Sequence, residues 1–195
     1  MISIIIPTFN EKKNITKIFL KLNRIKIVSE VIFVDDFSND GTINEFYKLK
    51  KYKKFKYFIR KSVPRDLSQS VVYGIINSKN KINIIMDCDL QHDPSYINLL
   101  FKKFKSRNID IVVASRFGGE NFKANISFVR TLASKFAILV INSIFGKITE
   151  DPLSGFFICN KNLVINYKKQ FFLKGYKILF DILYNSKKNL LAEDI

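Results

Sequence analysis

The sequence of 195 residues contains no tryptophan, a single histidine and only two cysteines. Cys88 and Cys159 stand far apart and show none of the spacings of cysteine-ligated metal sites. This scarcity excludes a small secreted fold held together by disulfides, and it favours a reducing, cytoplasmic setting. The lone histidine, His92, directly follows an acidic motif, and we interpret it as a structural or supporting residue rather than a catalytic one.

Long apolar runs are absent as well. None approaches the roughly 18 residues that span a bilayer, and the opening run, residues 1–7, lacks the basic leader and cleavage site of a signal peptide. The most apolar stretch, residues 136–141, lies inside a helical pattern. From the pattern alone we predict a core helix here, and the alternative is a helix that lies on a membrane surface.

Acidic residues are scarce relative to basic ones: 17 Asp and Glu stand against 33 Lys and Arg, which gives a formal net charge of +16. Such a balance favours anionic partners, whether nucleic acid, lipid headgroups or phosphorylated small molecules. Lysine runs such as residues 48–54 have the character of a solvated surface, so charge alone does not choose among these partners. The length and the 47% hydrophobic content predict one globular domain over residues 1–195.

Short β-prone runs alternate with helical patterns through the first two thirds of the chain. The predicted strands are residues 2–7, 30–34, 55–59, 82–86 and 109–114, and the predicted helices begin near residue 11 and then cover about 42–50, 67–76 and a segment from Pro94 onward. This alternation is typical of right-handed βαβ units, so we predict an α/β fold with a mostly parallel sheet flanked by helices.

The regular alternation of strands and helices stops after Ser115. A glycine-containing loop at 117–125 leads to a long apolar helix at about 127–145, a turn at Asp151-Pro152, a strand at 156–159 and a helix near 176–184. The chain then closes on what resembles the start of a further strand.

The most informative feature is the segment that follows the fourth predicted strand, where Asp87 and Asp89 stand one residue apart. Because side chains alternate along a strand, we expect the two carboxylates to project together and Cys88 to point away from them. Paired carboxylates at the end of a parallel strand suit Mg²⁺ or Mn²⁺, which a diphosphate could share. The alternative for an isolated pair of this kind is an ordinary acidic loop.

Polar or charged residues follow other predicted strands too. Asp35 and Asp36 end the second strand, where a carboxylate could hold nucleoside hydroxyls, although a simple helix N-cap cluster is an equal alternative. Arg116 follows the fifth strand and would face the same sheet edge. Together these strand ends favour a nucleoside-diphosphate site, with arginine neutralising phosphate oxygens. We interpret Phe9, Phe37 and Tyr73 as packing groups rather than stacking platforms for a base.

Five segments in this order resemble family-2 glycosyltransferases, and most closely the dolichol- or polyprenol-phosphate mannose synthases. They are residues 2–11, 34–42, 86–94, 114–119 and 151–156. The resemblance implies a Rossmann-like GT-A fold and an inverting transfer of a sugar from a nucleotide sugar to a polyprenyl or dolichyl phosphate. By this resemblance the sugar would be mannose from GDP-mannose, and the protein would be peripheral on the cytoplasmic face of a membrane, with the 127–145 helix against the lipid.

The resemblance also implies roles for individual residues of this sequence. The implied nucleotide-sugar residues are Pro7, Asn10, Glu11, Asp35, Asp36, Arg65, Asp87, Cys88 and Asp89. The implied metal-binding residues for Mg²⁺ or Mn²⁺ are Asp87, Asp89 and Gln91, and the implied catalytic residues are Asp89, Arg116 and Arg130. The acceptor phosphate is already an anion, so the reaction needs no strong general base.

Two departures from the family pattern bear on these expectations. Phe37 stands where the family usually has glycine. The family also continues past the equivalent of Ile195 with a strand and an arginine-containing segment, so we expect a C-terminally shortened domain that binds donor and transfers slowly or not at all.

Several alternatives stay open at this stage. They are a UDP-sugar transferase acting on a lipid or polysaccharide, a catalytically weak nucleotide-sugar-binding fragment, a sugar-phosphate nucleotidyltransferase and a nucleic-acid-binding protein. The nucleotidyltransferase would need a glycine-rich loop where residues 7–11 stand. Nucleic acid is disfavoured as a partner because acidic residues at the sheet edge would repel phosphates in the absence of a metal.

Overall fold

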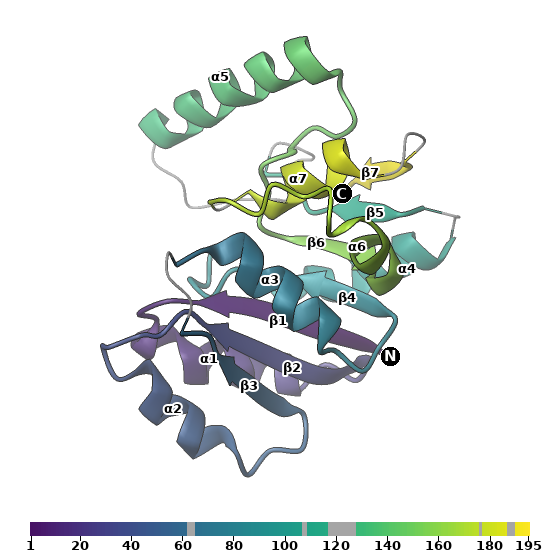
Figure 1. Cartoon of the computed structure of the whole chain (residues 1–195). Helices are drawn as coiled ribbons and strands as arrows, with labels where there is room; N and C mark the ends of the chain where they lie inside the picture. The colour runs from purple at the N-terminus through teal and green to yellow at the C-terminus, as the bar shows by residue number, and fades with distance from the viewer. Residues whose placement is uncertain (62–64, 107–108, 117–127, 176, 187–189) are drawn as a thin grey trace.

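A computed structural model describes residues 1–61, 65–106, 109–116, 128–175, 177–186 and 190–195, with the backbone alone for residues 128–135. A seven-stranded sheet in the order β3-β2-β1-β4-β6-β5-β7 forms the centre of the molecule (Figure 1). Helices pack on both faces of this sheet. The structure therefore confirms the predicted α/β fold with a mostly parallel sheet.

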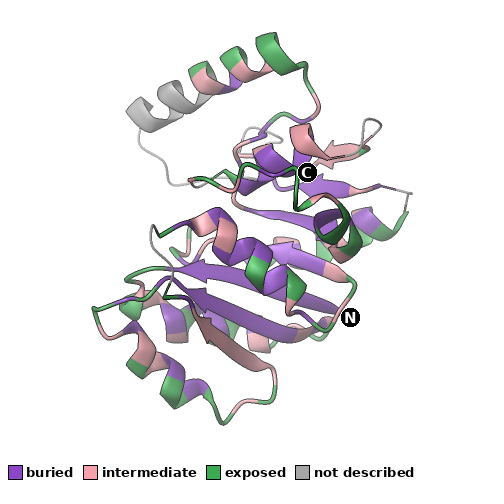
Figure 2. Ribbon diagram, in the orientation of Figure 1, coloured by how far each residue is buried: buried purple, intermediate pink, exposed green. Residues whose placement is uncertain are grey.

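The first four strands are parallel and supply the scaffold of the sheet. They are β1 (Ile2–Thr8), β2 (Val28–Asp35), β3 (Phe55–Ile59) and β4 (Ile82–Ile85). Thr8 pairs with Asp35 and Asp35 with Ile59, so these strands end at one level and the loops that follow them share one edge. Figure 2 shows β1 and β2 buried along nearly their whole length.

Successive side chains of these strands pack into two separate core layers, one on each face of the sheet. Ile4 and Ile6 face the helices α1 (Lys12–Asn23), α2 (Thr42–Leu49) and α4 (Tyr96–Ser106). Ile5 faces the other layer, which contains α3 (Leu67–Ile76), α6 (Lys161–Tyr167) and α7 (Ile178–Asn185). This two-sided burial explains the continuous apolar run of β1, which an edge strand would not show.

The far side of the sheet is mixed in direction. Strand β6 (Phe157–Asn160) runs antiparallel between β4 and β5 (Ile111–Val113), and β7 (Ala192–Asp194) pairs with β5 in parallel. Because β6 is reversed, the residues just before it arrive at the edge where β4 ends, and Phe157 pairs with Ile85. The 151–156 turn is thereby brought beside the segment that follows β4.

Helix α5 (Phe128–Phe145) stands away from the sheet (Figure 1). Its described side chains are mostly exposed (Figure 2), with Phe136 at 69% and Ile144 at 68%. The prediction of a core helix here is therefore wrong for the described part, where only Ile138 is buried. Among the described residues, no helix is both long enough and apolar enough to cross a membrane.

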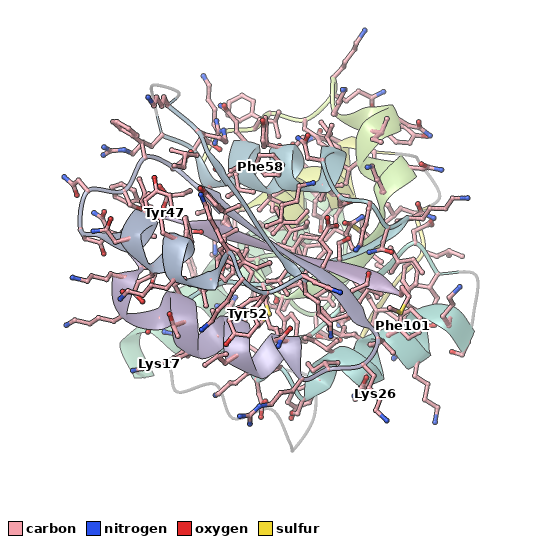
Figure 3. The ribbon with its side chains drawn as sticks, turned by 90° about the horizontal axis from the view of Figure 1, so that it is seen from below. Lys17, Lys26, Tyr47, Tyr52, Phe58 and Phe101 are labelled. Carbon is pink, nitrogen blue, oxygen red and sulfur yellow. The ribbon has the colours of Figure 1, made fainter. Side chains whose placement is uncertain are left out.

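The lysine-rich surface lies outside both core layers. Lys17 and Lys26, labelled in the view from below in Figure 3, are exposed. Tyr52, in the same view, packs instead on Phe19 with ring centroids 5.2 Å apart. The basic excess is thus carried partly by a solvated surface, as the lysine runs indicated.

Most predicted elements are present, with shifted ends. The fourth and fifth strands are shorter than predicted, the second is longer, and the fourth helix begins at Tyr96 rather than at Pro94. The short helix α6 was not predicted. The predicted final strand is present as β7.

Candidate functional site

A cleft of about 360 Å³ opens at the sheet edge where β1 and β4 end. The residues that line it come from the loops after these strands, from the segment after β5, from the start of α3, and from the segments before β6 and α7. They are Pro7, Phe9, Glu11, Leu67, Asp87, Cys88, Asp89, Gln91, His92, Arg116, Leu153, Gly155 and Lys177. The structure thus gathers Pro7, Glu11, Asp87, Cys88, Asp89, Gln91 and Arg116 of the predicted site around one cavity.

The two carboxylates of the β4 end lie in a loop, not on the strand. Strand β4 ends at Ile85, so strand alternation does not explain how Asp87 and Asp89 come to share the cleft. Cys88 is buried, at 3% exposure, yet it contributes to the cleft wall. Burial raises the pKa of its thiol, which favours the protonated form.

Gly155 makes room for Asp87. A Cβ at this position would fall within 3 Å of the carboxyl carbon and of both carboxyl oxygens of Asp87. Only a residue without a side chain lets the turn before β6 approach the carboxylate this closely. The sequence motif 151–156 therefore has a physical reason to contain glycine here.

The acidic groups of the cleft repel one another. Burial, followed by the Asp89 charge, raises the pKa of Asp87 to about 6. Burial also raises the pKa of Glu11, to which Asp89 and Asp87 add while a hydrogen bond from Asn14 opposes it. A cation between these groups would relieve the repulsion.

The donor set fits a hard divalent ion that a ligand completes. No cluster of three or more acidic, His or Cys side chains that could hold a metal is present among the described residues. Mg²⁺ and Mn²⁺ commonly take one or two carboxylates and fill the remaining positions with water and substrate phosphates. Asp87 and Asp89 supply the carboxylates, and the exposed amide of Gln91 lies beside them in the cleft.

Arg116 is held in place by a buried carboxylate. Its Nε donates to Oδ2 of Asp151 at 2.7 Å, and its Nη2 donates to Oδ1 at 2.8 Å. Asp151 is fully buried and lies in the turn before β6. This bidentate pair fixes the guanidinium at the cleft wall. The sequence motif suggested no role for Asp151.

Asp35 and Asp36 lie outside the cleft and are engaged by the protein itself. Oδ1 of Asp35 accepts a hydrogen bond from the Ser38 amide at 2.8 Å, and its Oδ2 accepts one from the Ser38 hydroxyl at 2.6 Å. Oδ1 of Asp36 accepts from Nη1 of Arg60 at 2.8 Å and from the Ser70 hydroxyl at 3.0 Å. Both acids are buried, so their geometry fits support of the strand end rather than open ligand contact.

Asn10 and Arg65 stand at the rim. The Asn10 amide donates to the Ser38 hydroxyl at 2.8 Å, which ties the ends of β1 and β2 together. The Arg65 guanidinium lies 4.5 Å from the ring centroid of Phe9. Phe9 is itself partly exposed and lines the cleft, so its interpretation as a packing group is wrong. The Phe9–Arg65 stack offers a flat cationic surface to a ligand.

His92 packs beneath the loop of Asp87, as expected of a supporting residue. Its ring stacks on Phe156 with centroids 5.1 Å apart, and its Nδ1 accepts from the Asp87 amide at 3.4 Å. Burial lowers its pKa to about 4, so it is neutral at physiological pH. A neutral imidazole that accepts a backbone hydrogen bond supports the loop of Asp87.

Two cations need separate mention. Lys177 lines the cleft, yet no motif in the sequence pointed to it. Arg130 lies in the part of α5 whose side chains are outside the described residues, so its predicted role stays a prediction.

Sequence comparison identifies the family. The profile of glycosyl transferase family 2 matches residues 3–186. The chain belongs to glycosyl transferase family 2. It is 34% identical over 98% of its length to a dolichol-phosphate mannosyltransferase of Pyrococcus furiosus, and it spans 54% of that protein. It is 29% identical over 93% of its length to the dolichol-phosphate mannosyltransferase of Saccharomyces cerevisiae, of which it covers 69%.

Solved structures with the same fold are more distant in sequence. Glucosyl-3-phosphoglycerate synthase from Mycobacterium tuberculosis, solved with UDP, superposes with a TM-score of 0.73 at 16% identity. The match covers all of this chain and 69% of the other. The same synthase solved with Mn²⁺, UDP-glucose and phosphoglyceric acid gives 0.73 at 18% identity. These likenesses establish the GT-A type of fold.

Proposed function

We propose that the protein transfers a sugar from a nucleotide sugar to a polyprenyl or dolichyl phosphate with inversion at the anomeric carbon. The observation that carries this proposal is the cleft itself, where Asp87 and Asp89 lie with Arg116 and Lys177 around one cavity. Acidic groups for a metal together with cations for phosphate oxygens suit a metal-bound diphosphate that leaves as an anion.

The proposed donor is GDP-mannose. Support comes from three relatives, at 27–34% identity, that are named dolichol-phosphate mannosyltransferases. The second candidate is a UDP-sugar, which is favoured by the fold neighbour solved with UDP-glucose and Mn²⁺. The exposed Phe9–Arg65 stack offers either base a surface to lie on.

The proposed cofactor is Mg²⁺ or Mn²⁺, held by Asp87 and Asp89 with Gln91 nearby. When bound, it would neutralise charge on the departing diphosphate. Arg116 is positioned by Asp151 to bind phosphate oxygens at the cleft wall. The ionised acceptor oxygen forms the new bond to the anomeric carbon while the bond to the diphosphate breaks and the diphosphate keeps the electron pair. No proton moves, which agrees with a neutral, structural His92.

The proposed acceptor is a lipid phosphate because an exposed apolar helix is attached at the cleft. The chain after α5 rejoins the body through Phe145, which packs on α7, and reaches the cleft at Asp151, the carboxylate partner of Arg116. The exposed side chains of α5 would lie on the membrane, and the basic surface would attract anionic lipids by about 1 kcal/mol per Lys or Arg near the bilayer. We place this peripheral association at the cytoplasmic face, because both cysteines are unpaired.

A thermal-shift panel tests the donor. GDP-mannose, UDP-glucose and UDP-N-acetylglucosamine would each be added with and without Mn²⁺, followed by transfer assays with polyprenyl phosphate for each donor that binds. We expect GDP-mannose with Mn²⁺ to give the largest stabilisation. Stabilisation by a UDP-sugar alone would select the second candidate, and no stabilisation by any donor would contradict the proposed function.

Liposome co-sedimentation tests the membrane surface. We expect stronger binding to anionic than to neutral vesicles, with a decrease as salt rises. Phe136→Glu together with Ile144→Glu should weaken it, whereas Leu99→Glu on α4, also at an exposed apolar residue, should not. Equal binding by the α5 variant and the wild type would remove α5 from the membrane surface.

A further inference from the structure

The segment between α6 and α7 brings a lysine into the cleft. Lys177 directly precedes α7, and its Nζ donates to the Leu153 carbonyl at 3.3 Å. Leu153 and Lys177 both line the cleft. The lysine is therefore anchored to the turn that also contains Asp151 and Gly155.

The backbone just before Lys177 is tied to the start of α3. Oδ2 of Asp66 accepts a hydrogen bond from the Gly175 amide at 2.6 Å. The Gly175 carbonyl accepts one from the Ser68 amide at 3.2 Å and another from the Ser68 hydroxyl at 3.0 Å. Gly175 has a φ of +90°, which residues with a side chain rarely adopt.

A second carboxylate fixes the same loop from the other side. Oδ1 of Asp181, on α7, accepts from the Phe172 amide at 2.9 Å, and its Oδ2 accepts from the Leu173 amide at 2.8 Å. Two buried acids, Asp66 and Asp181, thus bind backbone amides of the loop. These bonds hold the loop in one position.

Asp66 also connects this loop to the end of β2. Its amide donates to Oδ2 of Asp36 at 2.8 Å, and its carbonyl accepts from Nη1 of Arg60 at 2.9 Å. Its Oδ1 accepts from the Gln69 amide at 3.0 Å and caps α3. The buried Asp36–Arg60 pair therefore supports the same residue that holds Gly175.

The charges around the cleft indicate a phosphate-binding role for Lys177. Lys177 and Arg116 are both cations of one cavity. Burial, followed by the Arg116 charge, lowers the pKa of Lys177, and the charges of Asp87 and Asp151 oppose this shift in part. Nε and Nη2 of Arg116 already donate to Asp151. An incoming phosphate would offset the repulsion between the two cations and accept from the ammonium group.

We propose that Lys177 binds a phosphate oxygen of a substrate in this cleft, and that Asp66 is a positioning residue that sets Lys177 through Gly175. The inference rests on the proposed function and adds a phosphate-binding residue to it. The phosphate belongs either to the donor diphosphate or to the lipid acceptor, and both sources present the same chemistry to the lysine.

Calorimetric titration tests the role of Lys177 with Mn²⁺·GDP and Mn²⁺·UDP for the donor and a ten-carbon prenyl phosphate for the acceptor. We expect Lys177→Ala to weaken one of these ligands by about 10- to 100-fold, and Lys177→Arg to recover part of the loss. Lys174→Ala is the matched control, because Lys174 lies on the same loop with its Nζ 5.2 Å from the centroid of the Phe172 ring and does not line the cleft.

The pattern of loss identifies the source of the phosphate. Weaker nucleotide binding would assign Lys177 to the donor diphosphate, and weaker binding of the prenyl phosphate alone would assign it to the acceptor. Unchanged binding of every ligand that the wild type binds would overturn the inference. A folded wild type that binds none of the probes would contradict the proposed function itself.

A double-mutant cycle tests the positioning role of Asp66. Asp66→Asn keeps one side-chain oxygen to cap α3 but replaces the other, which accepts from the Gly175 amide, by an NH₂ group. The substitution should therefore weaken phosphate binding in the wild-type background. In the Lys177→Ala background it should have no further effect on binding. Its effect on thermal stability should be the same in both backgrounds. An equal loss of affinity in both backgrounds would show that Asp66 acts on the fold as a whole and not through Lys177.

Discussion

Two pairs of aspartates lie at or just after the ends of β2 and β4, the strands on either side of β1, and they are in opposite states. Asp35 and Asp36 are buried, and serine and arginine partners satisfy their oxygens. Asp87 and Asp89 lie in an open cleft, where their mutual repulsion helps to raise the pKa of Asp87 to about 6. An acid pair whose oxygens the protein binds supports the fold, whereas one that lines an open cleft is available to a cation.

The largest expected difference between the pairs is in stability. Asp36→Ala would leave Arg60, a residue that is 8% exposed, without its buried carboxylate partner. We expect the free energy of unfolding to fall by about 3–5 kcal/mol, as measured by urea denaturation. Glu150→Ala, which removes the exposed pair with Lys147, is the control and should cost less than about 1 kcal/mol. Equal losses would contradict a structural role for Asp36.

A methyl group placed beside Asp87 should have an effect of intermediate size on nucleotide binding. Gly155→Ala places a Cβ against the Asp87 carboxyl group, so either the carboxylate or the turn must move. Overpacking of this kind costs about 1–3 kcal/mol. We expect most of this cost to appear as a loss of Mn²⁺-dependent nucleotide affinity. Titration with Mn²⁺·GDP and Mn²⁺·UDP measures it. Full affinity in Gly155→Ala would show that the position of Asp87 is not critical.

The smallest expected effect is on pH dependence. The folded pKa of Asp87 lies above its ordinary value of 3.8, so this group favours the folded state as pH falls from about 6 to 4. His92 acts in the opposite direction, because its folded pKa of about 4 lies below 6.5. Asp87→Asn should therefore lose stability more steeply than the wild type between pH 6.5 and 4, as measured by denaturation across pH. Parallel profiles would contradict the shifted pKa of Asp87.

Mn²⁺-dependent nucleotide binding should also depend on the ionisation of Asp87. Protonation of Asp87 removes a carboxylate from the cleft, so Mn²⁺-dependent nucleotide binding by the wild type should weaken as pH falls through about 6. Titrations at pH 7.5 and 5.5 measure this change. Equal affinity at both values would show that Asp87 does not need to be ionised for binding.

The sequence was sufficient for the order of most elements and for the acidic core of the cleft. Apolar runs and helical periodicity predicted β1–β4 and the helices between them, and the pattern is strongest in β1 and β2, which are buried on both faces. The seven-residue α6 was missed because so short a helix shows little periodicity. The α5 pattern indicated a helix but not that its apolar side chains are exposed.

Other parts of the site depend on contacts between distant segments. Gly155 matters because an antiparallel β6 brings its turn against Asp87. Lys177 reaches the cleft because Asp66, over a hundred residues earlier in the chain, holds Gly175. Phe9 was assigned to packing, although the residue after β1 is open to the cleft. None of these contacts leaves a local pattern in the sequence.

The most direct test of the central claim is calorimetric titration of Mn²⁺·GDP and Mn²⁺·UDP into the wild type and Asp89→Ala. Asp89 is exposed in the cleft, so its removal should leave the free energy of unfolding within about 1 kcal/mol of the wild type. The account predicts that the wild type binds a nucleotide in the presence of Mn²⁺ and that Asp89→Ala, still folded, loses this binding. Unchanged Mn²⁺-dependent binding by Asp89→Ala would contradict it.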